Sequence, residues 1–328
     1  MEYKLHENGW TVLLGDFDFT KATQADADDI ARLVSTNVAV VAHGPSVEKL
    51  TPEDQVKFCS MIGHLEEYHD NTAWGRAIAL SNDEVGNKIQ RVTGATNEEG
   101  HPGLFGHDEE LDWHNNTPWD PKRKPVVFLK SLSGAEGSRT SWTNTQLAYE
   151  DMKREDPAFI AELEAKNYRI VCGWHAEGGH TTMYSYWSDF GELKKEVKNY
   201  ESAMPLVFTN ESGRKGFYLP FLQTFSFYGI TREQSLPVLE RVWNYCLQEK
   251  YMYHHDWIPG GSEVVIAEQW LSTHKRNEFA GMKTRFMQRS AVDYTNTTWW
   301  ADAKPAFSRQ ITQALRQNIR DRISQKVN

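Results

Sequence analysis

The residues between Leu111 and Trp119 contain side chains that could bind a metal ion. His114 and Asn116 are two positions apart, and side chains at that spacing on a β-strand point to the same face. An imidazole and an amide on one face supply half of a metal site, so a second imidazole must come from elsewhere in the chain. His274 is the candidate, because it follows the strand-like apolar run 264–267. The sequence therefore predicts a metal site assembled from two distant segments.

Two arginines follow the second histidine. Arg285 and Arg289 lie eleven and fifteen residues after His274, in a second strand-like run. Residues four apart on one strand share a face, and a guanidinium group pairs with a carboxylate through two parallel hydrogen bonds. The run could therefore hold a carboxylate, and a structural ion pair is the less favoured alternative for Arg289.

These fragments, in this order, resemble those of the taurine dioxygenase (TauD/TfdA-like) family of Fe(II)- and 2-oxoglutarate-dependent oxygenases. The family has a Trp-His-x-Asp motif, a Gly-Gly-x-Thr turn, and a distal His followed by Arg eleven and fifteen residues later. The counterparts here are 113–116, 137–142 and 274–289. The resemblance spans roughly Phe58 to Tyr294.

The resemblance implies a mostly β fold with helices (α+β), built on a double-stranded β-helix core of the jelly-roll or cupin type. It implies an oxidoreductase that uses Fe(II), 2-oxoglutarate and O2, with no catalytic residue beyond the metal ligands. The metal ligands would be His114, Asn116 and His274. The far carboxylate of 2-oxoglutarate would bind Arg285 and the hydroxyl of Thr140, with Arg289 near the cosubstrate or the substrate.

Asn116 departs from the family pattern, because an Asp stands at this position in the family. Fe(II), the 2-oxoglutarate dianion and an Asp sum to a charge of −1, whereas an Asn leaves the centre neutral. A halide could restore that charge, as in related halogenases with Gly or Ala here, but Asn would fill much of the halide's space. We therefore rank hydroxylation or a related C–H oxidation first and halogenation second. A catalytically silent relative acting as a binding protein, or an engineered Asp→Asn change, are the other possibilities.

The expected substrate is a small polar or acidic molecule, such as an amino acid, a sulfonate or a phosphonate. His69 lies where the family often places a substrate-contacting residue, and Asp112 could be an outer acid beside His114. The remaining histidines in the predicted covering loops are either substrate contacts or surface residues; they are His64, His107, His175 and His180. No role follows for His254 and His255.

Composition limits the other functions. The chain has 328 residues and a net charge of −9, which disfavours binding to nucleic acid by the chain as a whole. Its three cysteines are far apart and odd in number, as expected of reduced thiols in a cytoplasmic protein. No apolar run approaches the length of a membrane span, and the polar N-terminus does not resemble a signal peptide.

Periodicity and capping residues predict helices at 23–37, 51–62, 144–153, 156–165 and 231–250. Strands are expected at 11–19, 38–42, 126–132, 168–172, 206–209, 216–219, 263–268 and 285–292. The stretches 64–106 and 173–202 are irregular and are expected to form loops that cover the site.

The sequence predicts one oxygenase domain over residues 1–302, followed by a basic amphipathic helix over 303–328. Apolar residues recur every fourth position there: Phe307, Ile311, Leu315, Ile319, Ile323 and Val327. That stripe precesses around the helix, so we expect it to contact a second subunit, giving a homo-oligomer. The alternative is that the helix packs on its own domain.

Overall fold

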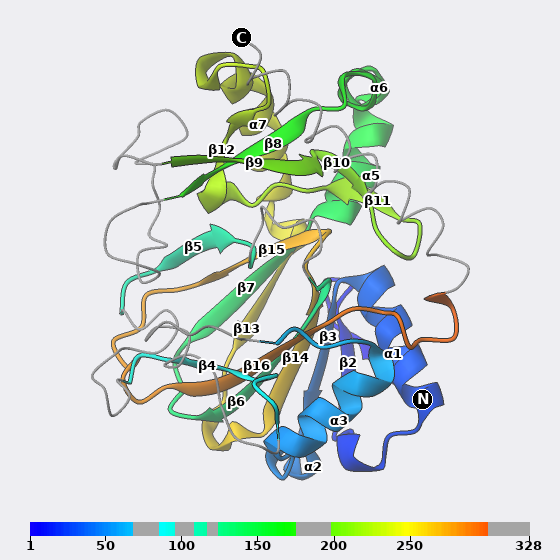
Figure 1. Ribbon diagram of the computed structural model, residues 1–328, viewed down its shortest axis with the longest axis vertical. Coiled ribbons are helices and arrows are strands. Elements are labelled where there is room, and N and C mark those ends of the chain that lie inside the picture. The colour runs from blue at the N-terminus through cyan, green and yellow to red at the C-terminus, as the bar shows by residue number, and fades with distance from the viewer. Residues whose placement is uncertain (68–84, 96–107, 117–123, 175–197, 301–328) are drawn as a thin grey trace.

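Two antiparallel-rich sheets face one another at the centre of the computed structural model (Figure 1), which describes residues 1–67, 85–95, 108–116, 124–174 and 198–300. The larger sheet has the strand order β1-β2-β3-β14-β6-β16-β4. Its strands are β1 (Lys4–Leu5), β2 (Val12–Gly15), β3 (Ala39–His43), β14 (Glu263–Glu268), β6 (Val126–Ser133), β16 (Phe286–Val292) and β4 (Gln90–Thr93). The smaller sheet has the order β13-β7-β15-β5, with strands β13 (Met252–Asp256), β7 (Arg139–Asn144), β15 (Ser272–Arg276) and β5 (Leu111–His114).

The inner faces of the two sheets share one hydrophobic core. Val265 and Met287 contribute from the larger sheet, and Trp142 and Tyr253 from the smaller one. Alternation along each strand puts these side chains inward. The arrangement confirms the predicted α+β class with a jelly-roll core.

Helices cover the outer face of the larger sheet. They are α1 (Gln24–Asn37), α2 (Pro45–Glu48) and α3 (Pro52–Ile62), and α1 and α3 lie beside β2 and β3 in Figure 1. Thr23 forms a capping box with Asp26 at the start of α1, and Thr51 caps α3, which satisfies backbone N–H groups that a helix end leaves unpaired. Both helices begin and end within about a residue of their predicted bounds.

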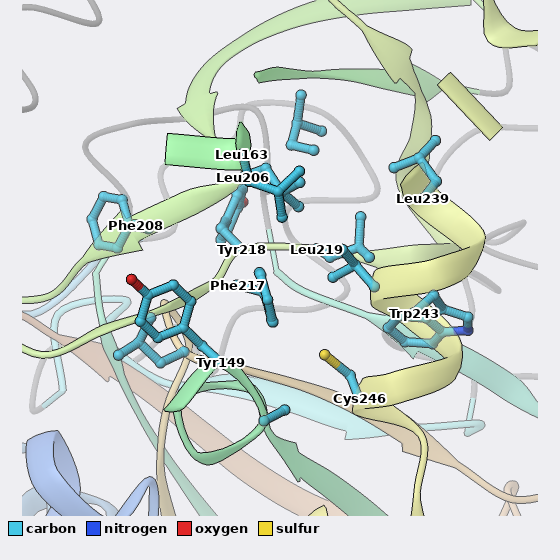
Figure 2. Packing of buried hydrophobic residues seen from close by; sticks show 14 of the residues in the cluster. Tyr149, Leu163, Leu206, Phe208, Phe217, Tyr218, Leu219, Leu239, Trp243 and Cys246 are labelled. Carbon is cyan, nitrogen blue, oxygen red and sulfur yellow. The ribbon is translucent and has the colours of Figure 1, made fainter. Parts of the chain in front are cut away.

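A third layer lies beyond the smaller sheet, in the upper part of Figure 1. It contains α5 (Thr145–Glu155), α6 (Pro157–Lys166), α7 (Arg232–Cys246), β8 (Arg169–Trp174), β9 (Lys198–Pro205), β10 (Val207–Thr209), β11 (Lys215–Phe217) and β12 (Thr224–Phe227). Figure 2 shows its core, in which Tyr149, Phe217 and Trp243 are among the buried side chains. Trp113 on β5 joins this core, because its ring meets Trp243 edge to face at 6.2 Å.

Some predicted elements were wrong. Helix α7 ends at Cys246 rather than Lys250, and a short 3-10 turn follows at Glu249–Tyr251, where Tyr251 is buried. Strand β4 lies inside one stretch predicted to be an irregular loop, and β9 begins inside the other. Both have polar sequences without clean alternation, and pairing with β16 and β8 makes them strands.

Several predictions concern residues outside the described ranges. These are the roles of His69, His107, His175 and His180 and the helix at 303–328, so the boundary at residue 302 also stays a prediction. Within the described residues, no helix is long and apolar enough to cross a membrane.

Candidate active site

A cavity between the two sheets brings together the six residues predicted to bind the metal and the cosubstrate. His114, Asn116, Thr140, His274, Arg285 and Arg289 all line it. Apolar side chains from both sheets complete the wall, including Val127, Leu129 and Leu111. A mostly apolar cavity with a few convergent polar groups is the usual form of a small-molecule site.

The two histidines are neighbours across adjacent strands. His114 on β5 is paired in register with His274 on β15, and the centroids of their rings are 4.2 Å apart with an interplanar angle of 52°. Trp142 on β7 stacks on His274 with its ring centroid at 6.5 Å. The sheet register therefore brings together two imidazoles that lie 160 positions apart in the sequence.

A hydrogen bond to a backbone carbonyl decides which ring nitrogen of His114 carries the proton. The Nδ1 atom of this buried ring lies 2.7 Å from the carbonyl oxygen of Asp112. Because a carbonyl oxygen only accepts, Nδ1 must carry the proton, and Nε2 keeps the lone pair that a metal requires. A hydrogen bond of this kind is the usual way in which proteins orient a metal-binding imidazole.

Asn116 lies just past the end of β5, and Gln269 holds it. Its side-chain Nδ2 donates to Gln269 Oε1 at 2.9 Å, and its backbone N–H donates to the same oxygen at 3.3 Å. The neighbouring Asn115 donates to the carbonyl oxygens of Gln269 and Ser272, both at 2.7 Å. These bonds fasten the end of β5 to the turn between β14 and β15.

Within the part of the chain that the structure describes, no three His, Cys, Asp or Glu side chains are grouped so that they could hold a metal. An amide oxygen can serve as a metal ligand, though without the charge of a carboxylate. The described donor set thus fits an ion held by His114, His274 and the side-chain oxygen of Asn116.

Arg285 is a buried cation that faces the cavity. Its Nε donates to Ser138 Oγ at 3.3 Å, and its side chain is 2% exposed. Burial, reinforced by the positive charge of Arg276, lowers the pKa of Arg285 to about 9. None of the ion pairs among the described residues includes Arg285 or Arg289. Since an uncompensated buried charge is costly, this position favours an anionic ligand.

The hydroxyl of Thr140 is oriented by Trp257. The indole N–H of Trp257 donates to Thr140 Oγ1 at 2.9 Å. A hydroxyl group has one proton to donate, and with its oxygen accepting from the indole, the O–H of Thr140 can point to a ligand in the cavity. Arg289 is also buried, and its Nε has no hydrogen-bond partner among the described residues.

Four polar residues in the cavity wall were not predicted, namely Arg276, Glu268, Gln269 and Ser272. Arg276 is buried on β15, where its guanidinium donates to the carbonyl oxygens of Glu109 and Asn277 at 2.8 and 2.9 Å. Glu268 ends β14 and accepts from the backbone N–H of Leu271 at 2.6 Å. Gln269 follows it. The two-residue spacing from His274 could have indicated Arg276, whereas Glu268 and Gln269 are recognised only when the strands are paired.

Other candidates lie elsewhere. Asp112 does not line the cavity, and its backbone carbonyl is the group that contacts the ring of His114. His64 is on the surface, where its Nδ1 is 3.0 Å from Thr295 Oγ1. His254 bonds to Ser141 and Glu249, and His255 bonds to Tyr253, so each has a structural partner.

Comparison with known proteins agrees with this geometry. Residues 4–291 match the family described as taurine catabolism dioxygenase TauD, TfdA family. An (S)-phenoxypropionate/α-ketoglutarate dioxygenase from Sphingobium herbicidovorans is 23% identical over 249 residues, covering 75% of this chain and 79% of its own length.

Two solved structures share the fold. A taurine dioxygenase from Burkholderia xenovorans superposes with a TM-score of 0.62 and 17% identity, over 86% of this chain and 85% of that one. AAD-2, solved in complex with Mn(II) and N-oxalylglycine, superposes with a TM-score of 0.66 and 17% identity, over 90% and 99% of the two chains. The family match over most of the sequence establishes that the chain belongs to the TauD/TfdA family of Fe(II)- and 2-oxoglutarate-dependent dioxygenases.

Proposed function

We propose that this dioxygenase oxidises a C–H bond, most simply by hydroxylation, of a small molecule that carries a carboxylate or another acidic group. His114, Asn116 and His274 would hold the metal. The observation that carries the proposal is that these three residues and the two buried arginines line one cavity.

Each side chain has a distinct role in this proposal. Arg285 binds the far carboxylate of 2-oxoglutarate, and Thr140 donates a further hydrogen bond to it. When bound, Fe(II) with 2-oxoglutarate supplies the oxidising chemistry, using O2. The apolar wall made by Val127, Leu129 and Leu111 excludes water from the reacting centre.

The charge of the cavity supports an acidic substrate. Arg285 is assigned to the cosubstrate. Arg289 is a second buried cation that lines the same cavity. The names of two relatives agree, because one acts on phenoxypropionate, a carboxylate, and another on taurine, a sulfonate. Arg289 would orient the acid group so that a neighbouring C–H bond faces the metal.

Asn116 favours hydroxylation over halogenation. Its amide is held in place by Gln269 and would fill much of the space that a halide ligand needs. The mass of the product separates the alternatives: hydroxylation adds one oxygen atom, chlorination exchanges hydrogen for chlorine, and desaturation removes two hydrogen atoms.

Anaerobic titration with Fe(II) and 2-oxoglutarate tests the proposal. The chelate should produce a weak visible charge-transfer band, and both His114→Ala and His274→Ala should abolish it. If the chain binds neither Fe(II) nor 2-oxoglutarate at millimolar concentrations, it would be the catalytically silent relative, which binds some other ligand or partner without catalysis.

A further inference from the structure

The hydrogen bonds around position 116 require an amide there rather than a carboxylate. Gln269 is buried, and both ends of its side-chain amide contact backbone groups. Oε1 accepts from the backbone N–H of Asn116 at 3.3 Å, and Nε2 donates to the carbonyl oxygen of Lys124 at 2.9 Å.

Backbone groups have fixed roles, since an N–H only donates and a C=O only accepts. The orientation of the Gln269 amide therefore does not depend on how the similar-looking amide oxygen and nitrogen are assigned. Its Oε1 must face Asn116, and its Nε2 must face Lys124.

This orientation decides what residue 116 can be. The side chain at 116 meets Oε1 of Gln269 at 2.9 Å, and that oxygen can only accept. Nδ2 of Asn116 supplies the donor that Oε1 requires, and this pairing turns the side-chain oxygen of Asn116 away from Gln269. An Asp has two oxygens that only accept when ionised, so one of them would lie against Oε1. Reversing the Gln269 amide to suit an Asp would break its bonds to both backbone groups.

We propose that Gln269 is a positioning residue that selects Asn at position 116 and directs the Asn116 oxygen to the metal. Asn116 is then the native ligand and not a lost carboxylate. With Asn116 as a ligand, the metal centre carries one negative charge fewer than it would with an Asp at this position. The proposal rests on the proposed function where it concerns the metal, but the amide pairing itself is a property of the protein alone.

The decisive experiment measures the effect of Asn116→Asp in two backgrounds, wild type and Gln269→Met. Methionine has nearly the size of glutamine but presents no oxygen to position 116. The readouts are the affinity for Fe(II) in the presence of 2-oxoglutarate, from the anaerobic charge-transfer band, and the melting temperature of the metal-free protein.

In wild type, Asn116→Asp should fail to raise metal affinity, because the new carboxylate is opposed by Gln269 Oε1. In the Gln269→Met background the same change should raise affinity, since a charged ligand binds Fe(II) more strongly. We expect the two effects to differ by roughly tenfold or more, as for other contacting pairs. The melting temperature should fall further on Asn116→Asp in wild type than in the Gln269→Met background. Equal effects in the two backgrounds would overturn the proposal.

If Asn116→Asp prevents folding in both backgrounds, variants of Gln269 alone still test the proposal. Gln269→Met should weaken metal binding by roughly tenfold, because it releases the Asn116 amide. Gln269→Glu keeps an accepting oxygen for Asn116 but loses the bond to the Lys124 carbonyl oxygen, so its metal affinity should lie between those of wild type and Gln269→Met. Wild-type affinity in the Gln269→Met variant would refute the positioning role.

The two proposals fail in different ways. If the wild-type chain binds no metal, the proposed function is lost, yet the difference in melting temperature between backgrounds still tests the amide pairing. If wild type binds metal and that difference is absent, only the role of Gln269 is lost.

Discussion

At the scale of single residues, the groups that face the cavity are held by bonds that do not involve a ligand. The ring of His114 is oriented by a backbone carbonyl, Thr140 by an indole N–H, and Arg285 by the hydroxyl of Ser138. Side chains fixed in this way lose little further freedom when a ligand binds. The arrangement predicts that individual substitutions will affect ligand affinity more than folding.

Arg285→Ala should weaken 2-oxoglutarate binding by roughly tenfold to a hundredfold, corresponding to the ~1.5–3 kcal/mol of hydrogen bonds to a charged group. The metal-free protein should lose little stability, because the change removes a buried cation that has no ion-pair partner among the described residues. Titration of the charge-transfer band with 2-oxoglutarate and a thermal melt measure the two effects.

Arg139→Ala is the matched control, since Arg139 forms an ion pair with Asp256 on the surface. It should change neither quantity appreciably. Normal 2-oxoglutarate affinity in Arg285→Ala would show that the cosubstrate carboxylate binds a different arginine.

Four of the cavity residues could be predicted from their spacing in the sequence, although Asn116 lies just past β5 and Arg285 just before β16. His114 and Asn116 are two apart, and Arg285 and Arg289 are four apart. Gln269 and Glu268 could not, because their roles depend on which strands pair and in which register. Nothing in Glu-Gln-Trp at 268–270 indicates that the glutamine meets a residue 153 positions earlier.

At the scale of elements, β5 links the site to the third layer. Trp113 packs against Trp243 of α7, while the next residue, His114, faces the cavity. Neighbouring residues on a strand point to opposite sides. The position of His114, the proposed metal ligand, therefore depends on packing in a core that contains no part of the cavity.

Trp113→Ala should lower the free energy of unfolding by about 3–5 kcal/mol and should also weaken metal binding, because β5 can shift toward the space left by the indole. Trp113→Phe keeps most of the packing and should have a smaller effect on both. Chemical denaturation and the charge-transfer titration measure these changes. Unchanged metal affinity in a destabilised Trp113→Ala protein would show that strand pairing with β15 alone positions His114.

A close backbone contact joins the end of α3 to the end of β16. Gly63 follows α3, and a Cβ added there would lie 2.1 Å from the carbonyl oxygen of Asp293. Gly63→Ala should therefore destabilise the fold by roughly 1–3 kcal/mol, measured by denaturation. Gly9→Ala is the control, because Gly9 has φ +76° and open space around it, so its cost comes from backbone strain alone at about 1 kcal/mol. A smaller loss at Gly63 than at Gly9 would mean that the two segments separate easily.

Elements with strong local signals were predicted well. The helices α1 and α3 begin at capping threonines, and apolar runs marked β3, β6 and β14. Strands β4 and β9 were missed, since their residues are polar and only their partners supply the hydrogen bonds. Local propensity is weak where a neighbouring strand decides the conformation.

At the scale of the whole molecule, three layers enclose the site. Helices α1 and α3 cover one face of the larger sheet, the cavity lies between the two sheets, and the third layer covers the smaller sheet (Figure 1). Separate hydrophobic cores lie between the helices and the larger sheet, between the two sheets, and in the third layer. The family resemblance predicted the two sheets, but it did not predict how the third layer is assembled from α5, α6 and α7.

Removal of the residues after Asp302 tests the predicted role of the terminal segment. If the apolar stripe of 303–328 contacts a second subunit, the full-length chain should be a dimer by light scattering and the truncated chain a folded, active monomer. Exposure of such a stripe would otherwise cost roughly 1.5–3 kcal/mol for each large side chain. A full-length monomer that no longer folds after truncation would instead mean that the segment packs on its own domain.

The bonds from Asn115 to the turn between β14 and β15 have a consequence for the order of events during synthesis. Its partners, the carbonyls of Gln269 and Ser272, are translated more than 150 residues after Asn115 itself. The first histidine and its neighbouring amide therefore leave the ribosome long before the turn and His274 exist. Contacts so distant in sequence form slowly, so the nascent chain has no complete cavity in which to trap iron. Metal loading through both histidines must therefore follow synthesis of the turn and His274.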